Sequence, residues 1–253
     1  MECNKLGFDI IDRRYDEELC RLIKNDGLSW LLWIGDEYCE TNLLVVGESN
    51  YADQDTPDED AKSAGLRVKQ NHKFTRGVVS CFCVCRKRKN QTFDGIGFVL
   101  QSGSRYLIEE SVKVWRRIAF MDLVQIPMLG KGWGKVARNR PSMEAMEDGW
   151  CVLRKVVEIL KPKAILFVGC STVTAVKAKK RQRKFGISEL QLSKKDKRGI
   201  LAMNDGCKIP FYVMPNPGSA YGFSKNEWQK IVARSYGLSV ERKEGAHDQR
   251  NEF

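Results

Sequence analysis

The stretch from Leu43 to Tyr51 constrains the fold of this chain more than any other. It reads LLVVGESNY, so four apolar residues run into Gly47 and four polar or aromatic side chains follow. A continuous Leu/Val run is typical of a strand that is buried on both faces of a sheet. In open α/β sheets, ligands bind at the carboxyl ends of such strands. We therefore expect a functional site at Gly47 and the residues after it, although an ordinary polar turn would fit the same letters.

Further apolar runs alternate with amphipathic segments along the chain. Short apolar runs at 164–169 and 209–214 lead into turn-forming residues, which predicts two more buried strands. This alternation favours an α/β protein, and we predict a three-layer α/β/α sandwich around a short, mostly parallel sheet. The segments with helical patterns are 15–34, 108–120, 143–160 and 224–236, with another helix from Ser171 onward. A further strand is expected at 78–85, because three cysteines alternate along it.

The length of the chain, 253 residues, allows one large domain with its own hydrophobic core. We predict a single domain over residues 1–240, with a candidate insertion near 85–105, and a polar tail over 241–253. No apolar run is long enough to span a bilayer, and the first residues (MECNKLGFDII) lack the pattern of a signal peptide. The sequence therefore predicts a cytoplasmic protein without a membrane partner, and we expect a monomer.

The excess of basic residues points to a polyanionic partner. The chain has 43 Lys and Arg against 32 Asp and Glu, which gives a net charge of +11. The basic residues also form clusters, at 177–184, at 194–198 and within the Gly-rich segment 130–141. Clustered positive charge favours nucleic acid, so DNA is the expected partner, whereas a merely solvated surface is the alternative.

The cysteines and histidines argue against several other kinds of site. The nine cysteines are scattered without a CxxC pair, so the sequence predicts free thiols, no metal site and no cofactor. The two histidines are His72 and His247, and the second lies in the predicted polar tail. A catalytic site of the Ser-His-Asp or Cys-His type is therefore not expected. A metal-dependent nuclease that uses the carboxylates between 53 and 60 is an alternative.

Three motifs follow one another in a distinctive order. GESNY occupies 47–51, NPGSAYGF occupies 216–223, and Asp122 lies between them within an apolar run. Across residues 43–236 this order resembles the uracil-DNA glycosylase superfamily. That family has a Gly and an acidic or amide residue after its first strand, and HPS or NPS after its last strand. The resemblance implies an enzyme that flips a base out of DNA and hydrolyses its N-glycosidic bond.

The chain departs from the family's pattern at positions that carry chemistry. Ser49 stands where enzymes with a GQDPY motif have a water-positioning Asp, and Asn50 replaces their Pro. Glu48 matches the Glu of the iron–sulfur class, but four cluster cysteines are not recognisable, so no cluster is expected. The second motif reads NPGS instead of NPS, and Asp122 replaces the family's base-reading Asn.

The chemistry of base removal assigns roles to these residues. An oxocarbenium-like sugar needs a group that holds the attacking water, and the departing base needs an amide donor. The predicted catalytic residues are Glu48, Asn50 and Asn216, with Asp53 as a substitute for holding the water. The residues expected to bind the flipped base are Ser49, Tyr51, Phe74 and Asp122. The residues expected to contact DNA are Ser219, Tyr221, Phe223, Lys131, Lys135, Arg138, Arg140, Lys179, Lys180 and Arg181.

Asp122 indicates which base is removed. An Asn donates to a uracil carbonyl and accepts from its ring N–H, whereas a carboxylate only accepts and suits the exocyclic amine of cytosine. We therefore hypothesise a modified cytosine, hydroxymethylated or glucosylated as in phage DNA, rather than plain uracil. An anti-phage role is consistent with the resemblance.

Other readings of the same residues stay open. The enzyme could be a uracil-DNA glycosylase of base-excision repair, or the chain could be a catalytically inactive DNA-binding module of the same fold. Glu48 could cap a turn, and Asn216 could form a turn before Pro217. Asp122 could be structural, as a helix cap or in an ion pair with Arg116 or Arg117.

Overall fold

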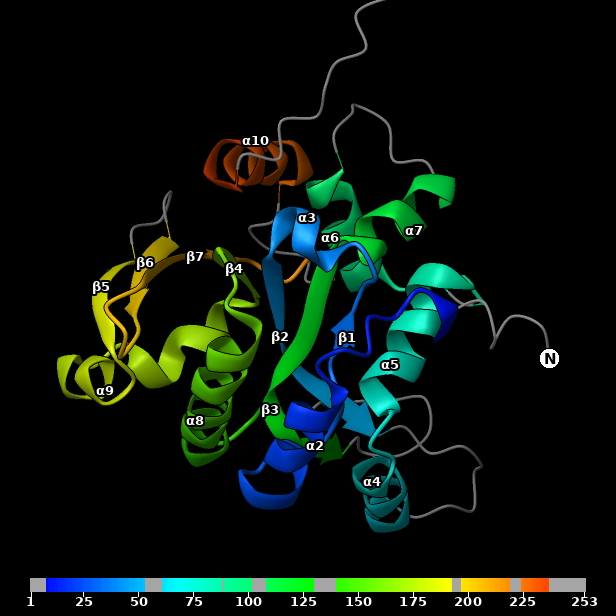
Figure 1. Ribbon diagram of the computed structural model, residues 1–253, viewed down its shortest axis with the longest axis horizontal. Helices are drawn as coiled ribbons and strands as arrows, with labels where there is room; N and C mark the ends of the chain where they lie inside the picture. Colours follow the sequence, from blue (N-terminus) through cyan, green and yellow to red (C-terminus); the bar gives the residue numbers. More distant parts are fainter. Residues whose placement is uncertain are drawn as a thin grey trace, which may run out of the picture.

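The computed structural model describes residues 8–52, 61–87, 89–101, 108–129, 140–192, 197–218 and 224–236. Over these ranges the chain has a mixed α/β fold built on one seven-stranded sheet (Figure 1), which confirms the predicted α/β class. The strands are β1 (Trp33–Ile34), β2 (Leu43–Ala52), β3 (Ile118–Leu129), β4 (Ala164–Val168), β5 (Ile187–Leu192), β6 (Lys197–Ala202) and β7 (Lys208–Met214). The helical elements are α2 (Asp16–Asn25), α3 (Tyr38–Thr41), α4 (Ala61–Gln70), α5 (Phe74–Val79), the π-helix η1 (Ser80–Val84), α6 (Gln91–Leu100), α7 (Ile108–Arg116), α8 (Met143–Leu160), the 3₁₀-helix η2 (Cys170–Val176), α9 (Lys179–Lys184) and α10 (Lys225–Tyr236).

The sheet has the order β1-β3-β2-β4-β7-β6-β5, and only its centre is parallel. β3, β2, β4 and β7 run parallel to one another. β1 pairs antiparallel with β3 at one edge, and β6 and β5 form an antiparallel extension at the other. The prediction of a short, mostly parallel sheet is therefore not confirmed. β5 and β6 bury few of their residues, so they lack the continuous apolar run by which the central strands are recognised.

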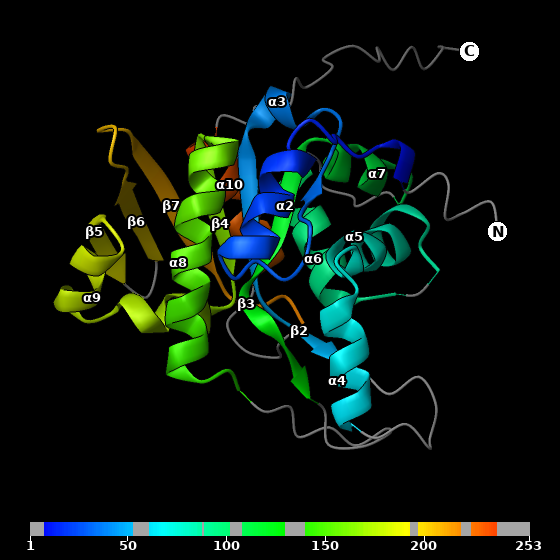
Figure 2. The same cartoon turned by 60° about the horizontal axis from the view of Figure 1, so that its bottom comes forward.

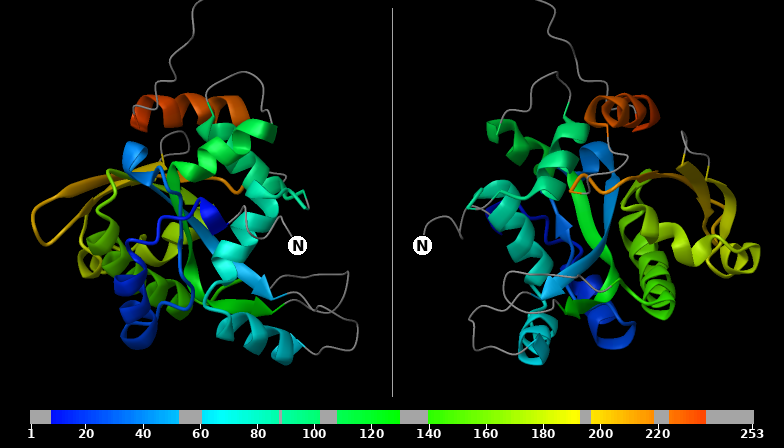
Figure 3. Two further views of the ribbon diagram at one scale, coloured as in Figure 1. Left: turned by 45° about the vertical axis from the view of Figure 1, so that its right-hand side comes forward. Right: turned by 180° about the vertical axis from the view of Figure 1, so that it is seen from behind.

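Helices cover both faces of the central strands. Along β2, Leu44 and Val46 pack on one face while Leu43 and Val45 pack on the other, because successive side chains of a strand point to opposite sides. α2 and α8 lie side by side over the first face (Figure 2). α5, η1, α6, α7 and α10 supply apolar residues to the second, where Figure 3 shows α10 close to α6. The central strands are thus held between two apolar layers.

Helix α8 packs directly against β3. A Cβ added at Gly149 would lie 2.1 Å from the backbone oxygen of Leu123, so the helix approaches the strand at a distance that only Gly allows. The next residue, Trp150, is fully buried and donates its Nε1–H to the carbonyl of Thr172 at 2.9 Å. These two contacts fix α8 against the first face of the sheet.

Most of the predicted elements are present, with shifted ends. The helices over 143–160 and 224–236 are confirmed. The helix expected over 15–34 ends at Asn25, and the helix expected over 108–120 ends at Arg116, where the chain turns into β3. The helix expected from Ser171 onward is the 3₁₀-helix η2, which begins at Cys170 and precedes α9. None of the described helices is long and apolar enough to cross a membrane.

The strand predicted at 78–85 is wrong. This segment ends α5 and continues as the π-helix η1. Val79 and Cys83 are buried four residues apart, which places them on one face of a helix. The alternating cysteines are therefore a misleading signal. π-helical turns often occur at functional sites, and this one carries Phe82 into the cavity described below.

Replacing Gly149 with Ala is expected to destabilise the fold by about 1–3 kcal/mol, because the added methyl overlaps a backbone carbonyl. Gly77→Ala in α5 is the matched control. A Cβ at Gly77 meets nothing within 4 Å, so this exchange is expected to stabilise the helix by roughly 0.5–1 kcal/mol. Urea denaturation followed by circular dichroism measures both effects. Equal free energies of unfolding for the two variants would contradict the close packing of α8 on β3.

Candidate functional site

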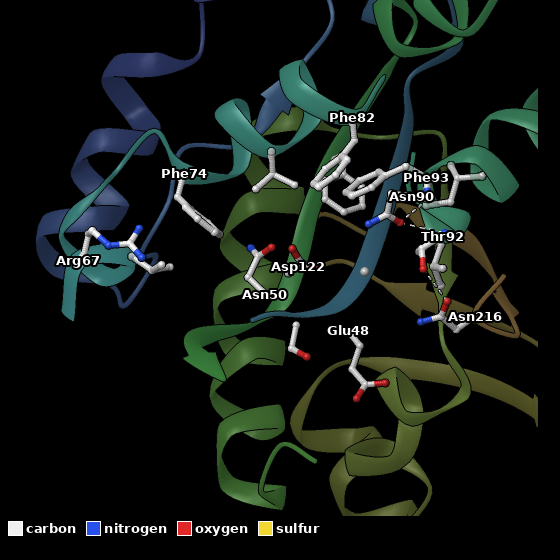
Figure 4. Close-up of a pocket in the computed structure, with 17 residues that line it drawn as sticks. Glu48, Asn50, Arg67, Phe74, Phe82, Asn90, Thr92, Phe93, Asp122 and Asn216 are labelled. Atoms are coloured by element: carbon white, nitrogen blue, oxygen red, sulfur yellow. Dashed lines mark hydrogen bonds between the residues drawn. The ribbon is translucent and has the colours of Figure 1, made fainter. Parts of the chain in front are cut away.

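A cavity of about 390 Å³ opens where β4 and β7 end and beside the middle of β2 and β3 (Figure 4). β2 contributes residues 47–50, β3 contributes Asp122, and the segment after β7 contributes Asn216. Side chains from α4, α5, η1 and α6 complete the wall. A volume of this size is typical of a small-molecule site. Its position follows the strand-end rule for α/β sheets.

The cavity gathers six of the residues that the motifs singled out. They are Glu48, Ser49, Asn50, Phe74, Asp122 and Asn216. The backbone of Tyr51 belongs to β2, but its side chain lies outside the described residues. Also outside them are Asp53, Lys131, Lys135, Arg138, Ser219, Tyr221 and Phe223. Segments that are far apart in the sequence therefore meet at one place.

Gly47 and Asp122 face each other across neighbouring strands. They are partners in the parallel register of β2 and β3. A Cβ on Gly47 would lie 2.3 Å from Asp122 Oδ1 and 3.2 Å from Phe120 Cζ. The Asp122 carboxyl thus occupies the space that a side chain at position 47 would need. This explains the Gly that follows the buried Leu/Val run.

The Asp122 side chain is buried, with 6% of the residue exposed. Burial raises the pKa of its carboxyl, and the charge of Glu48 raises it further, to about 7. Arg116 instead pairs with Asp36 at 2.8 Å, and Arg117 pairs with other carboxylates. The ion pair considered as a structural role for Asp122 is therefore wrong. A carboxyl that titrates near neutral pH can donate as well as accept, so it is not limited to the acceptor role assigned from the sequence.

Glu48 is held by a serine from the neighbouring strand end. Ser171 Oγ donates to Glu48 Oε2. Gly169 follows β4 with a φ of +107°, and this turn starts η2 and brings Ser171 beside β2. Sequence reasoning missed Ser171 as a site residue. A signal was present, because the order of apolar run, Gly and polar residues at 164–171 repeats the order at 43–49.

Asn216 is oriented by two donors to its side-chain oxygen. Thr92 Oγ1 (2.9 Å) and Gly218 N (2.8 Å) both donate to Asn216 Oδ1. The amide nitrogen, which carries the donors, points toward the side of the cavity where Glu48 lies (Figure 4). Thr92 is in the first turn of α6, which Asn90 caps. The positive end of the α6 dipole therefore lies at the cavity.

Phenylalanines form the apolar part of the wall. Phe82 and Phe93 stack with ring centroids 5.7 Å apart and an interplanar angle of 13°, and Phe120 packs against Phe93 at 5.5 Å. Phe74 also lines the cavity and packs against Trp30 at 5.8 Å. Phe82 and Phe93 escaped prediction because one was assigned to a strand and the other to the candidate insertion near 85–105. Such a wall suits a planar ring.

The predicted phosphate contacts within the described ranges do not line the cavity. Arg140, Lys179 and Lys180 are exposed. Arg181 forms an ion pair with Glu147 at 2.7 Å. Helix α9, which carries the last three of these basic residues, packs on β5 at the far edge of the sheet (Figure 1). These residues can contact a partner only outside the cavity.

Comparison with known proteins adds no family to these observations. No protein-family model matches the chain, and no curated protein matches it. The functional conclusion therefore follows from the chemistry of the cavity.

Asp122 is expected to make the fold less stable as the pH rises. Its carboxyl has a pKa of about 7 in the folded state against an ordinary value of 3.8. Between these values the folded state binds more protons than the unfolded state, so the free energy of unfolding falls with rising pH. Asp122→Asn removes this titration. From about pH 5 to about pH 8 the variant should therefore gain roughly 2–3 kcal/mol relative to the wild type.

Asp12→Asn is the matched control for this experiment. Burial acts to raise the pKa of Asp12, but hydrogen bonds from Arg14 and its charge outweigh burial, and the pKa is lowered. Asp12 is therefore ionised throughout the range tested, and this variant should differ from the wild type equally at both pH values. Urea unfolding of the three proteins measures the effect. A difference between wild type and Asp122→Asn that does not change with pH would contradict the raised pKa.

Proposed function

We propose that the chain is a monofunctional DNA glycosylase, which hydrolyses the N-glycosidic bond of a flipped-out base and leaves an abasic site. One observation carries this proposal: Glu48 on β2, Asp122 on β3 and Asn216 after β7 converge on one cavity with a phenylalanine wall. Base excision needs a carboxylate for the water, a donor for the leaving base and a pocket for the extruded ring. We also infer a uracil-DNA glycosylase-like arrangement of three layers around the parallel centre of the sheet.

Glu48 is assigned to the attacking water. As the base departs, the sugar gains oxocarbenium character, and a nearby carboxylate stabilises that positive charge while it accepts a proton from the water. Ser171 binds Glu48 Oε2, which fixes the direction of the carboxylate. Oε1 is then the oxygen assigned to the water.

Asn216 is assigned to the departing base. Thr92 and Gly218 hold its oxygen, which fixes the direction of the amide nitrogen. This nitrogen is the group assigned to donate to a base carbonyl. Negative charge develops on the base as the glycosidic bond breaks, and a fixed amide donor stabilises that charge without reorganising. The positive end of α6, at the same side of the cavity, adds to this stabilisation.

The proposed target is a modified cytosine, such as a hydroxymethylated or glucosylated base of phage DNA. Asp122 accepts from the exocyclic amine of cytosine through a carboxyl oxygen, which its acid form also offers. Plain uracil is the alternative target, since the acid form of Asp122 can donate to a carbonyl. Removal of a phage-type base would place the protein in anti-phage defence, whereas removal of uracil would place it in repair.

Contacts outside the cavity are assigned to the DNA backbone. The net charge of +11 favours a polyanion. Lys179, Lys180 and Arg140 are exposed and can bind phosphates, which positions the duplex without reading its sequence.

A DNA-binding module without catalysis is the second candidate. Ser49 and Asn50 replace an Asp and a Pro of the GQDPY motif, and these are positions that carry chemistry in that family. Within the described ranges, Ser49 Oγ and Asn50 Nδ2 are buried without a hydrogen-bond partner. A module that binds an extruded base without hydrolysing it needs no residue to hold a water, so it could carry Ser49 and Asn50 at these positions.

The test is formation of abasic sites. Purified protein is incubated with DNA that contains uracil, cytosine, 5-hydroxymethylcytosine or glucosylated 5-hydroxymethylcytosine at one position, in the presence of a chelator, and alkali then cuts any abasic site. We expect cutting of a modified-cytosine substrate. Glu48→Gln and Asn216→Ala should each lower the single-turnover rate by about 100-fold. Glu189→Gln, an exposed substitution on β5, is the matched control and should retain the wild-type rate.

Two outcomes would overturn the assignment. Cutting that survives both Glu48→Gln and Asn216→Ala would show that the cavity is not the active site. No cutting of any substrate, together with tight and salt-sensitive DNA binding, would favour the binding module.

A further inference from the structure

We propose that Asn50 and Asp122 form the base-reading end of the cavity, and that Asp122 is the acid that protonates an aminopyrimidine as it leaves. This inference rests on the proposed glycosylase function and names its class of base. The base carries an exocyclic amine beside a ring nitrogen acceptor, as cytosine and its 5-substituted derivatives do. Asn50 then reads the base instead of holding the water.

The side chain of Asn50 carries a buried hydrogen-bond donor without an acceptor among the described residues. The residue is 9% exposed, and its Nδ2 has no hydrogen-bond partner in the part of the chain that the structure describes. A buried unpaired donor costs roughly 1–3 kcal/mol, so each one in a folded protein needs an explanation. Figure 4 shows the Asn50 amide beside the Asp122 carboxyl, whereas the Glu48 carboxylate points away from both. A ligand with an acceptor at this point satisfies the amide.

Asp122 supplies the second group at this end of the cavity. Its carboxyl is buried against Gly47 and lines the same cavity. In its acid form it can make two hydrogen bonds to cytosine, because its O–H donates to N3 and its carbonyl oxygen accepts from the N4 amine. Asn50 Nδ2 can then donate to O2, the remaining acceptor on that edge of the base. The pair therefore complements the whole Watson–Crick edge of cytosine.

The leaving-group chemistry gives a reason for an acid at this position. Cytosine is a poorer anionic leaving group than uracil, because an amine and a ring nitrogen spread negative charge less well than two carbonyls do. Protonation at N3 lets the base leave as a neutral molecule. An Asn amide has no proton to give at neutral pH, whereas a carboxylic acid does. An Asp in place of the family's Asn is therefore what removal of an aminopyrimidine requires.

The proposed step balances in atoms and electrons. The proton of the Asp122 carboxyl moves to N3, and the C1′–N1 bond breaks with its electron pair going to the base, which leaves as a neutral tautomer. The oxygen of the water bonds to C1′, and one water proton passes to Glu48. Glu48 then releases a proton to solvent and Asp122 takes one up, which restores both groups.

The surroundings of Asp122 support an acid form near neutral pH. Burial and the charge of Glu48 raise its pKa to about 7. Among the described residues that line the cavity, the other ionisable groups are Glu48 on β2 and Arg67 on α4, whereas α5, η1 and α6 contribute apolar or neutral side chains. The acid form is therefore lost as the pH rises through this value.

The first test is binding of free bases, which needs no catalysis. Isothermal titration calorimetry with cytosine, 5-hydroxymethylcytosine and uracil is carried out at about pH 6. We expect the cytosine-type bases to bind about tenfold more tightly than uracil. Asn50→Leu and Asp122→Leu should each weaken their binding by about tenfold. Asn25→Leu, an exposed substitution at the end of α2, is the matched control.

The second test is the pH dependence of the single-turnover rate on modified-cytosine DNA. The wild-type rate is expected to fall about tenfold per pH unit above about pH 7. Asp122→Asn keeps the shape of the side chain but has no acid, so it should be slow at every pH and should lose this fall. Asp205→Asn, at an exposed position outside the cavity, should keep the wild-type profile.

The outcomes separate this inference from the proposed function. Selective binding of cytosine-type bases without abasic sites on any DNA would support the base-reading pair and contradict the glycosylase. Abasic sites whose rate and pH profile are unchanged in Asp122→Asn would overturn the acid role and leave the glycosylase standing. Equal binding of uracil and cytosine, or binding of neither, would overturn the base-reading pair.

Discussion

The contact between Asp122 and Gly47 is the constraint on which the site depends. Parallel pairing of β2 and β3 sets these two residues opposite each other, and the missing side chain of Gly47 leaves a place for the carboxyl. The same contact buries the carboxyl beside Glu48, which raises the pKa of Asp122. A strand register thus decides both where a functional group lies and whether it carries a proton.

The other side chains of the cavity are held in place by apolar packing and by hydrogen bonds that do not involve this contact. Two apolar layers hold the central strands, Ser171 directs Glu48, and Thr92 at the start of α6 directs Asn216. Groups that are held before a ligand arrives need no reorganisation during a reaction. The described site therefore has the preorganisation that stabilisation of a charged transition state requires.

The parts of the fold that follow from local pattern were predictable from the sequence, whereas the parts that follow from tertiary contacts were not. The apolar runs of β2 and β4 and the capped helix α8 are local signals, and the strand-end rule predicted one shared site. Glu48 and Asp122 reach that site from within β2 and β3, because both strands continue past it. The polar strand β6 forms because β7 offers it a partner, and β5 then pairs with β6 at the edge of the sheet; their own residues carry no strong strand signal. Phe82 reaches the cavity only because its segment is helical. The charge state of Asp122 likewise depends on its burial, which the sequence does not display.

The most direct measurement is mass spectrometry of the small molecules released from modified-cytosine DNA by the purified protein. A glycosylase is expected to release the intact free base while the DNA strand keeps its sugar and phosphates. Release of a nucleotide or nucleoside would indicate a nuclease, and a deaminated base left in the DNA would indicate a deaminase; either result would contradict the account. Release of the free base by wild type and its loss in Glu48→Gln would place hydrolysis of the N-glycosidic bond at this cavity.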